Sequence, residues 1–68
     1  MEITVNGEKE EIDAGLSIRQ YIQQKGQNPQ KVVVEYNGQI VKRKEWEDLQ
    51  LQQDDTLEVL KFMGGGAR

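Results

Sequence analysis

The residues best suited to chemistry lie near the C-terminal end of the sequence, where Gly64, Gly65 and Gly66 precede Ala67 and Arg68. Three extended glycines span about 10 Å and carry no Cβ, so they can enter a channel too narrow for a folded body. A carboxylate at the end of such a segment is ionised at neutral pH. It can attack an activated phosphate, but it resists nucleophiles until a partner activates it. We expect these five residues to form a flexible tail.

Two other interpretations of the glycines remain open. Flexible linkers and frayed termini are often rich in glycine and need no further function. A phosphate-binding loop is disfavoured, because such loops present the N-terminus of a following helix to the anion. Only two residues follow Gly66.

The composition excludes most other chemistry. The 68 residues include no cysteine and no histidine, which removes thiolate nucleophiles, imidazole bases, disulfides and the common zinc sites. The carboxylates Asp54 and Asp55 are more simply explained as a turn. A chain of this length forms one domain with a small core, which leaves little room for an enclosed pocket. Catalysis in a pocket is therefore not expected.

The charge and hydropathy of the chain limit its partners and its location. Nine basic and twelve acidic residues are spread along the sequence and give a net charge of −3, which disfavours binding to nucleic acid. Lys42, Arg43 and Lys44 are a local exception, which we interpret as a solvated strand end rather than a phosphate contact. No apolar run approaches ~20 residues, so we predict no membrane span and no secretory signal. We expect a cytoplasmic protein.

Two β-hairpins are predicted from their turns. Asn6-Gly7 and Asn37-Gly38 are typical of two-residue type I′ turns, in which both central residues take positive φ. The four flanking strands are expected at residues 2–5, 8–12, 31–36 and 39–41.

A short helix is predicted between the two hairpins. Ser17 is the expected N-cap, and Gln20 completes a capping box with it. Leu16 and Tyr21 are spaced as a hydrophobic staple, and Gly26 takes the position after the last helical residue. One apolar stripe along this helix indicates that a single face packs against a sheet.

The rest of the chain completes an α+β domain. The run Val32-Val33-Val34 favours a strand buried on both faces. A helical turn is expected at residues 45–49, with Trp46 packing at the edge of the core. A last strand is expected at residues 56–63. The order β-β-α-β-β-β predicts a mixed sheet of four to five strands with one helix packed across it.

The alternation of the last strand predicts a docking surface. Leu57 and Val59 should point toward the core, whereas Leu60 and Phe62 should point away from it. Two exposed apolar side chains beside the tail would suit the docking of a partner enzyme. The alternative is that the segment around Trp46 covers this face of the sheet.

A family resemblance rests on several of these features together. They are the order of elements, the two Asn-Gly turns, the segment Asn37-Gly38-Gln39-Ile40-Val41 followed by basic residues and Trp46, and the last strand that runs into three glycines. Over residues 1–66 the chain resembles the ThiS/MoaD family of ubiquitin-like sulfur carriers. Its length fits the thiazole-forming branch better than the longer molybdopterin branch. The resemblance implies a β-grasp domain over residues 1–63 and a tail over residues 64–68.

The resemblance also implies a function for the tail. In this family a ThiF-like adenylyltransferase uses ATP to adenylate the C-terminal glycine, and a cysteine desulfurase system converts the adenylate to a thiocarboxylate. A ThiG-like thiazole synthase then receives the sulfur. By this likeness Gly66 would bear the thiocarboxylate, and Gly64 and Gly65 would thread the active site of the partner. The chain would be a co-substrate rather than an enzyme, with no bound cofactor, and would be a monomer when free.

Ala67 and Arg68 depart from the family pattern, in which the chain ends on glycine. Our hypothesis is that a peptidase removes them before activation. The alternatives are an added extension, or a protein that is not a carrier in this form. Other functions also stay open: a molybdopterin-type carrier, a modifier that attaches Gly66 to lysine, or an interaction module that binds a partner through Leu60 and Phe62.

Overall fold

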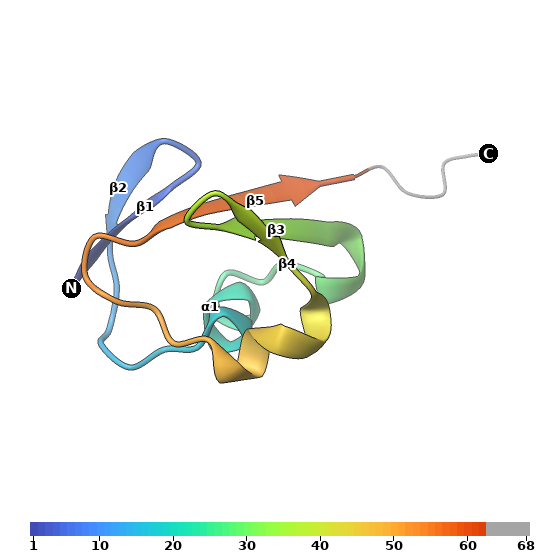
Figure 1. Ribbon diagram of the computed structural model, residues 1–68, viewed down its shortest axis with the longest axis horizontal. Helices are drawn as coiled ribbons and strands as arrows, with labels where there is room; N and C mark the ends of the chain where they lie inside the picture. The colour runs from blue at the N-terminus through green and yellow to red at the C-terminus, as the bar shows by residue number, and fades with distance from the viewer. Residues whose placement is uncertain (63–68) are drawn as a thin grey trace.

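The computed structural model describes residues 1–62, and these form a five-stranded sheet with one α-helix (Figure 1). The order β-β-α-β-β-β is as predicted, with two 3-10 helices in addition. The strands predicted at 8–12 and 31–36 are each one residue shorter than predicted. The last strand ends at Lys61, and Met63 of its predicted range lies outside the described residues. In chain order the elements are β1 (Glu2–Val5), β2 (Glu8–Glu11), α1 (Ile18–Gln24), η1 (Pro29–Lys31), β3 (Val32–Tyr36), β4 (Gln39–Val41), η2 (Arg43–Asp48) and β5 (Thr56–Lys61).

The strands lie in the order β2-β1-β5-β3-β4, so the last strand in the sequence occupies the centre of the sheet. β5 pairs parallel with β1 and antiparallel with β3, while the two hairpins pair antiparallel. The sheet is therefore mixed, as predicted. α1 lies across one of its faces (Figure 1). Within residues 1–62 no helix combines the length and the apolar character that crossing a membrane would require.

Both hairpin turns have the predicted backbone. Asn6 and Gly7 have φ values of 51° and 84°, and Asn37 and Gly38 have values of 49° and 89°. Type I′ turns need this left-handed conformation at both central residues, and Asn and Gly adopt it at low cost. The turns thereby fix the register of both strand pairs.

The ends of α1 follow the predicted capping. Ser17 Oγ accepts a hydrogen bond from the Gln20 backbone N–H at 3.1 Å, and Gln20 Oε1 accepts one from the Ser17 N–H at 2.9 Å. Gly26 has a φ of 70°, which suits the residue that ends a helix. The helix buries one stripe, consisting of Ile18, Tyr21 and Ile22.

Two predictions about the core are wrong. Trp46 is 1% exposed and belongs to the centre of the core, not to its edge. The reason is that η2 spans a longer segment than the expected turn and packs beside α1. Val32 and Val34 are buried, but Val33 is only partly buried. The valine run is thus covered fully on one face only, because α1 lies on one face of the sheet.

Candidate functional site

The predicted working residues Gly64, Gly65 and Gly66 lie outside the described residues. What the structure describes is the end of β5 that leads to them, and this end is held on both sides. On the β3 side, the Phe62 N–H donates to the Lys31 carbonyl at 3.1 Å. On the β1 side, the Asn6 side chain accepts from the Val59 N–H at 2.8 Å and donates to the Val59 carbonyl at 3.4 Å. The strand is therefore a rigid base for the glycine segment.

The two faces of β5 differ as the alternation predicts. Leu57 is fully buried, whereas Leu60 is 48% exposed and Phe62 is 45% exposed. Leu60 lies opposite Val33 of β3, on the sheet face away from the core. The alternative that the Trp46 segment covers this face is wrong, because Trp46 packs in the core. A docking role for Leu60 and Phe62 stays a prediction.

Ile40 is an exposed apolar residue that the sequence reasoning did not select. It is 69% exposed on β4, and it pairs with Glu35 of β3, which in turn pairs with Glu58 of β5. Ile40 therefore shares the open sheet face with Leu60, two strands away. The alternation of the second hairpin could have identified it, since the neighbouring Val41 is partly buried against the core.

The carboxylates considered for catalysis have structural contacts instead. Asp55 Oδ2 accepts from the Tyr36 hydroxyl at 2.6 Å and from the Gln52 N–H at 2.7 Å, and its Oδ1 accepts from Asn37 Nδ2 at 3.2 Å. Partial burial opposes ionisation of Asp55, but these hydrogen bonds outweigh it and lower the pKa of its carboxyl group. The hydrogen bond that the Tyr36 hydroxyl donates to Asp55 raises the pKa of Tyr36 to about 12. Asp55 thus fixes the turn before β5, as its position in the sequence indicated.

Replacing Asp55 by Asn should reduce the free energy of unfolding by about 1 to 2 kcal/mol at pH 7, because an amide cannot accept all three hydrogen bonds. The lowered pKa of Asp55 gives stability that is present above its ordinary value of 3.8 and lost as the pH falls through the folded-state value. The free energies of unfolding of wild type and Asp55→Asn, measured with urea, should therefore differ at pH 7 and become similar near pH 2.

Asp54 is the matched control for this experiment. It is exposed, and among residues 1–62 the only hydrogen bond that its side chain accepts comes from Gln53 Nε2, at 3.1 Å. Its φ of 70° suits asparagine as well. Asp54→Asn should leave the stability within ~0.5 kcal/mol of wild type at both pH values. Equal losses from the two substitutions would contradict the role given to Asp55.

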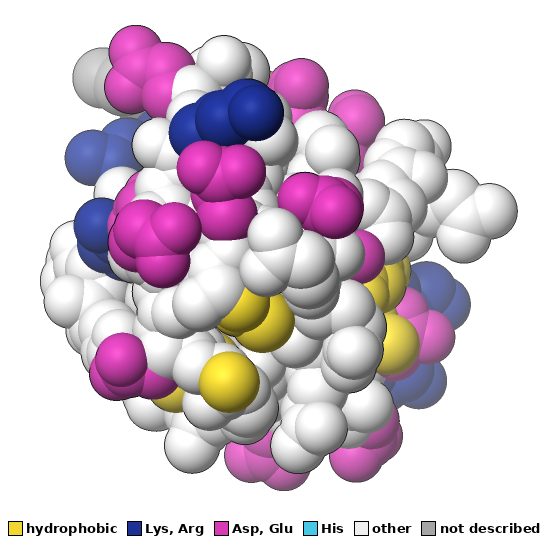
Figure 2. All heavy atoms as spheres, turned by 90° about the vertical axis from the view of Figure 1, so that its left-hand side faces the viewer, with side chains coloured by type: hydrophobic (Ala, Val, Ile, Leu, Met, Phe, Trp, Pro, Cys, Tyr) yellow, Lys and Arg dark blue, Asp and Glu magenta, His cyan; other side chains and the backbone are white. Residues whose placement is uncertain are grey.

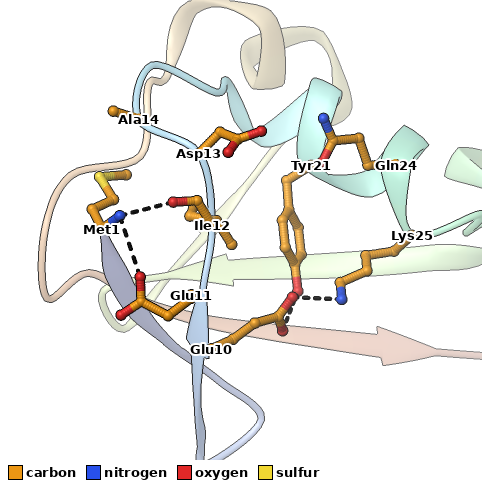
Figure 3. Close-up of a pocket in the computed structure, with 9 residues that line it drawn as sticks. All are labelled: Met1, Glu10, Glu11, Ile12, Asp13, Ala14, Tyr21, Gln24 and Lys25. Atoms are coloured by element: carbon orange, nitrogen blue, oxygen red, sulfur yellow. Dashed lines mark hydrogen bonds and ion pairs between the residues drawn. The ribbon is translucent and has the colours of Figure 1, made fainter.

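A surface hollow of about 540 Å³ lies between the end of β2 and α1 (Figure 3). Glu10 accepts from the Tyr21 hydroxyl at 2.9 Å and pairs with Lys25. Burial together with this hydrogen bond raises the pKa of Tyr21. Met1 lines this hollow, and Figure 1 shows that the N-terminus lies on the opposite side of the molecule from the end of β5. Within residues 1–62 no cluster of acidic side chains could hold a metal ion.

One helix across a mixed sheet, with a central last strand that leads into glycines, defines a ubiquitin-like β-grasp protein. The family model described as "ThiS family" matches residues 1–66 of this chain. The chain therefore belongs to the ThiS family.

Two solved structures from Geobacter metallireducens share the fold. The crystal structure of its thiamine biosynthesis protein ThiS superposes with a TM-score of 0.83 at 32% identity, covering 97% of this chain and 100% of that one. A solution structure of a thiamine biosynthesis protein from the same organism gives a TM-score of 0.81 at 30% identity, covering 100% and 91%. These likenesses confirm the predicted β-grasp fold.

Two curated relatives carry the name thiazole synthase. The protein from Magnetococcus marinus is 39% identical over 66 residues, which are 97% of this chain and 20% of the relative. The protein from Paramagnetospirillum magneticum is 30% identical over 67 residues, which are 98% of this chain and 21% of the relative. The chain thus spans about a fifth of the length of these relatives.

Proposed function

We propose that the chain is a sulfur carrier of thiamine biosynthesis and that Gly66 carries the sulfur. The observation that supports this most strongly is the extent of the family match, which runs through Gly66 and stops before Ala67. A thiocarboxylate can form on Gly66 only when Gly66 is the last residue, so the bond between Gly66 and Ala67 must first be cleaved. We assign this cleavage to a peptidase.

The proposed chemistry begins with an inert carboxylate. The Gly66 carboxylate attacks the α-phosphate of ATP in a ThiF-like adenylyltransferase, and pyrophosphate leaves. The terminal sulfur of a persulfide supplied by a cysteine desulfurase system then attacks the acyl carbon, and AMP leaves with the electron pair of the broken bond. A thiol of the same system cleaves the resulting acyl disulfide by attacking its outer sulfur, so that a disulfide forms and the thiocarboxylate leaves. The product is a thiocarboxylate, a soft nucleophile held on a protein. ATP is bound by the partner in this scheme, and the carrier needs no cofactor of its own.

The proposed acceptor of the sulfur is a ThiG-like thiazole synthase. Two relatives with this printed name contain a segment similar to almost the whole of this chain. Such a segment within a synthase favours transfer to thiazole over transfer to a molybdopterin precursor. We propose that the carrier acts in the cytoplasm, is monomeric when free and binds its partners in turn.

The described part of the chain would position the glycine segment for its partners. β5 is held by β3 and by the Asn6 side chain up to its last residues, so docking of the folded body fixes where the glycines start. Gly64 and Gly65 would thread the channel of the partner, and Leu60 and Phe62 would dock beside its entrance. This division of roles explains why a protein without cysteine or histidine can take part in sulfur chemistry.

Two forms of the chain test this proposal, the full sequence and a form that ends at Gly66. Each is incubated with a ThiF-like enzyme, ATP and a sulfur source, and intact mass is measured for the replacement of one oxygen by sulfur. We expect conversion of the shorter form only. A conjugate through Gly66 to a lysine would instead indicate a modifier, and no conversion of either form would overturn the sulfur-carrier function.

A further inference from the structure

The lysines and arginines of the described chain fall into two groups. Lys9 pairs with Glu2 at 3.8 Å, Arg19 pairs with Glu47 at 3.7 Å, and Lys25 pairs with Glu10. Within residues 1–62 the remaining cations form no ion pair. They are Lys31, Lys42, Arg43, Lys44 and Lys61.

Two of these unpaired cations lie at the exit of β5, and a third contacts the residue before Lys31. Lys61 is the last residue of β5 and lies opposite Val32, and the Lys31 carbonyl accepts the Phe62 N–H. Arg43 Nη1 donates to Gln30 Oε1 at 3.3 Å, which ties the start of η2 to η1. We name Lys31, Arg43 and Lys61 the basic collar. All three side chains are exposed.

The basic collar and the apolar pair lie on different sides of this exit. Lys61 shares the sheet face of the buried Val32, because the two residues are cross-strand partners. Leu60 and Phe62 occupy the other face. The chain thus leaves β5 between a cationic side and an apolar side. A partner that binds the chain at this exit would contact both the cationic side and the apolar side.

The opposite end of the molecule is acidic. Residues 1–13 contain five carboxylates and one lysine, and Asp54 and Asp55 precede β5 close to the same end. Figure 2 shows this end, where acidic side chains outnumber basic ones. Figure 1 shows that β5 ends on the side of the molecule opposite the N-terminus. The start of β3 lies beside this end, because the Phe62 N–H donates to the Lys31 carbonyl. Unpaired cations therefore lie at the exit of the chain, and the acidic first 13 residues lie toward the other end of the molecule.

We propose that the basic collar docks on an acidic protein surface, namely a rim of carboxylates around the channel that receives the glycine segment. This inference rests on the proposed function and adds the chemistry of the partner surface. Loss of Ala67 and Arg68 would leave eight basic and twelve acidic side chains, so the charge would change from −3 to −4. Such a carrier is repelled by an acidic partner in most orientations. The unpaired cations at the exit favour the one orientation in which the glycines lead.

The test uses the form that ends at Gly66 and compares two matched double variants. Lys31→Gln/Lys61→Gln removes two charges from the basic collar, and Lys9→Gln/Arg19→Gln removes two charges elsewhere. Stopped-flow association with the ThiF-like enzyme is measured at low and high ionic strength, with and without ATP. Adenylation is followed at subsaturating and saturating carrier concentrations.

We expect the collar variant to lower the association rate constant about tenfold at low ionic strength, with a smaller difference in high salt. The KM of the carrier should rise while kcat stays near wild type. Arg43→Gln should behave in the same way, and Arg43→Lys should retain most of the rate. The Lys9→Gln/Arg19→Gln variant should change the rate less than twofold.

Three outcomes would overturn the inference. Equal losses in both double variants would show that only net charge matters. Unchanged rates in both would show that the basic collar makes no contact. A loss seen only with ATP present would assign the basic collar to nucleotide phosphates instead of protein carboxylates. A failure of the sulfur-carrier function is distinguishable, because wild type itself would then give no thiocarboxylate whatever the rates of association.

Discussion

Replacing Leu60 and Phe62 together by serine should lower kcat/KM for adenylation of the Gly66-ended chain about 100-fold. Apolar contacts that are desolvated on binding contribute about 1 to 2 kcal/mol each at such an interface, and about 2.8 kcal/mol for the pair corresponds to 100-fold. Both side chains are about half exposed in the free chain, so their loss should change the stability of the fold by less than ~1 kcal/mol. Steady-state kinetics at varied carrier concentration measures the effect, and urea unfolding measures the stability.

If Leu60 and Phe62 form the docking contact, two further results are expected. At saturating carrier concentration, kcat should approach that of wild type, because the glycine segment itself is unchanged. Ile40→Ser is the matched control, since Ile40 is an exposed apolar residue of the same sheet face but lies two strands from β5. It should lower kcat/KM less than fivefold. Equal losses from the control and the double variant would show that the contact is not centred on the exit of β5.

Trp46→Ala should remove a large part of the stability of the fold, about a third or more of the free energy of unfolding. Deleting a buried tryptophan side chain costs about 3 to 5 kcal/mol, and a domain of 68 residues has about 3 to 10 kcal/mol of stability in total. Trp46 is 1% exposed, and its Nε1–H donates to the Val41 carbonyl at 3.4 Å. Its loss therefore removes both a large apolar group and a hydrogen bond. Circular dichroism with thermal and urea unfolding measures the outcome.

Two control substitutions should reduce the free energy of unfolding less than Trp46→Ala does. Trp46→Phe keeps a ring in the core and should cost about 1 to 3 kcal/mol, leaving a folded protein. Glu47→Ala changes the next residue of η2, whose exposed ion pair with Arg19 contributes ~0.5 kcal/mol or less. A Trp46→Ala variant that unfolds at the same urea concentration as Glu47→Ala would contradict the place of Trp46 in the core.

The fold could be predicted largely from local signals, because its turns and caps are local. Asn6-Gly7 and Asn37-Gly38 specify their turns through backbone conformations that few residues adopt. Ser17 and Gln20 specify the start of α1 through hydrogen bonds over one turn. Such features need no knowledge of distant segments. The exposure of Leu60 and Phe62 could also be predicted locally, because side chains alternate between the two faces of a strand.

The errors concern residues whose surroundings come from distant parts of the chain. Trp46 belongs to the core because η2 packs beside α1, and no local pattern records that contact. Val33 is partly exposed because only one face of the sheet is covered, whereas a run of three valines indicates two covered faces. The basic collar was missed for the same reason, since Lys31 and Lys61 are brought together only by the pairing of β3 with β5.

The central position of β5 also sets the order in which a nascent chain can complete its fold. β5 is made last, yet it lies between β1 and β3 and pairs with both. Until it leaves the ribosome, the two hairpins have no strand to join them, and an isolated hairpin is at best marginally stable. Closing the sheet then pairs residues near the two ends of the described chain, a non-local step that slows folding. The body can therefore finish folding only after β5 has left the ribosome, so a truncated translation product without β5 cannot present a folded docking surface to the partner enzymes.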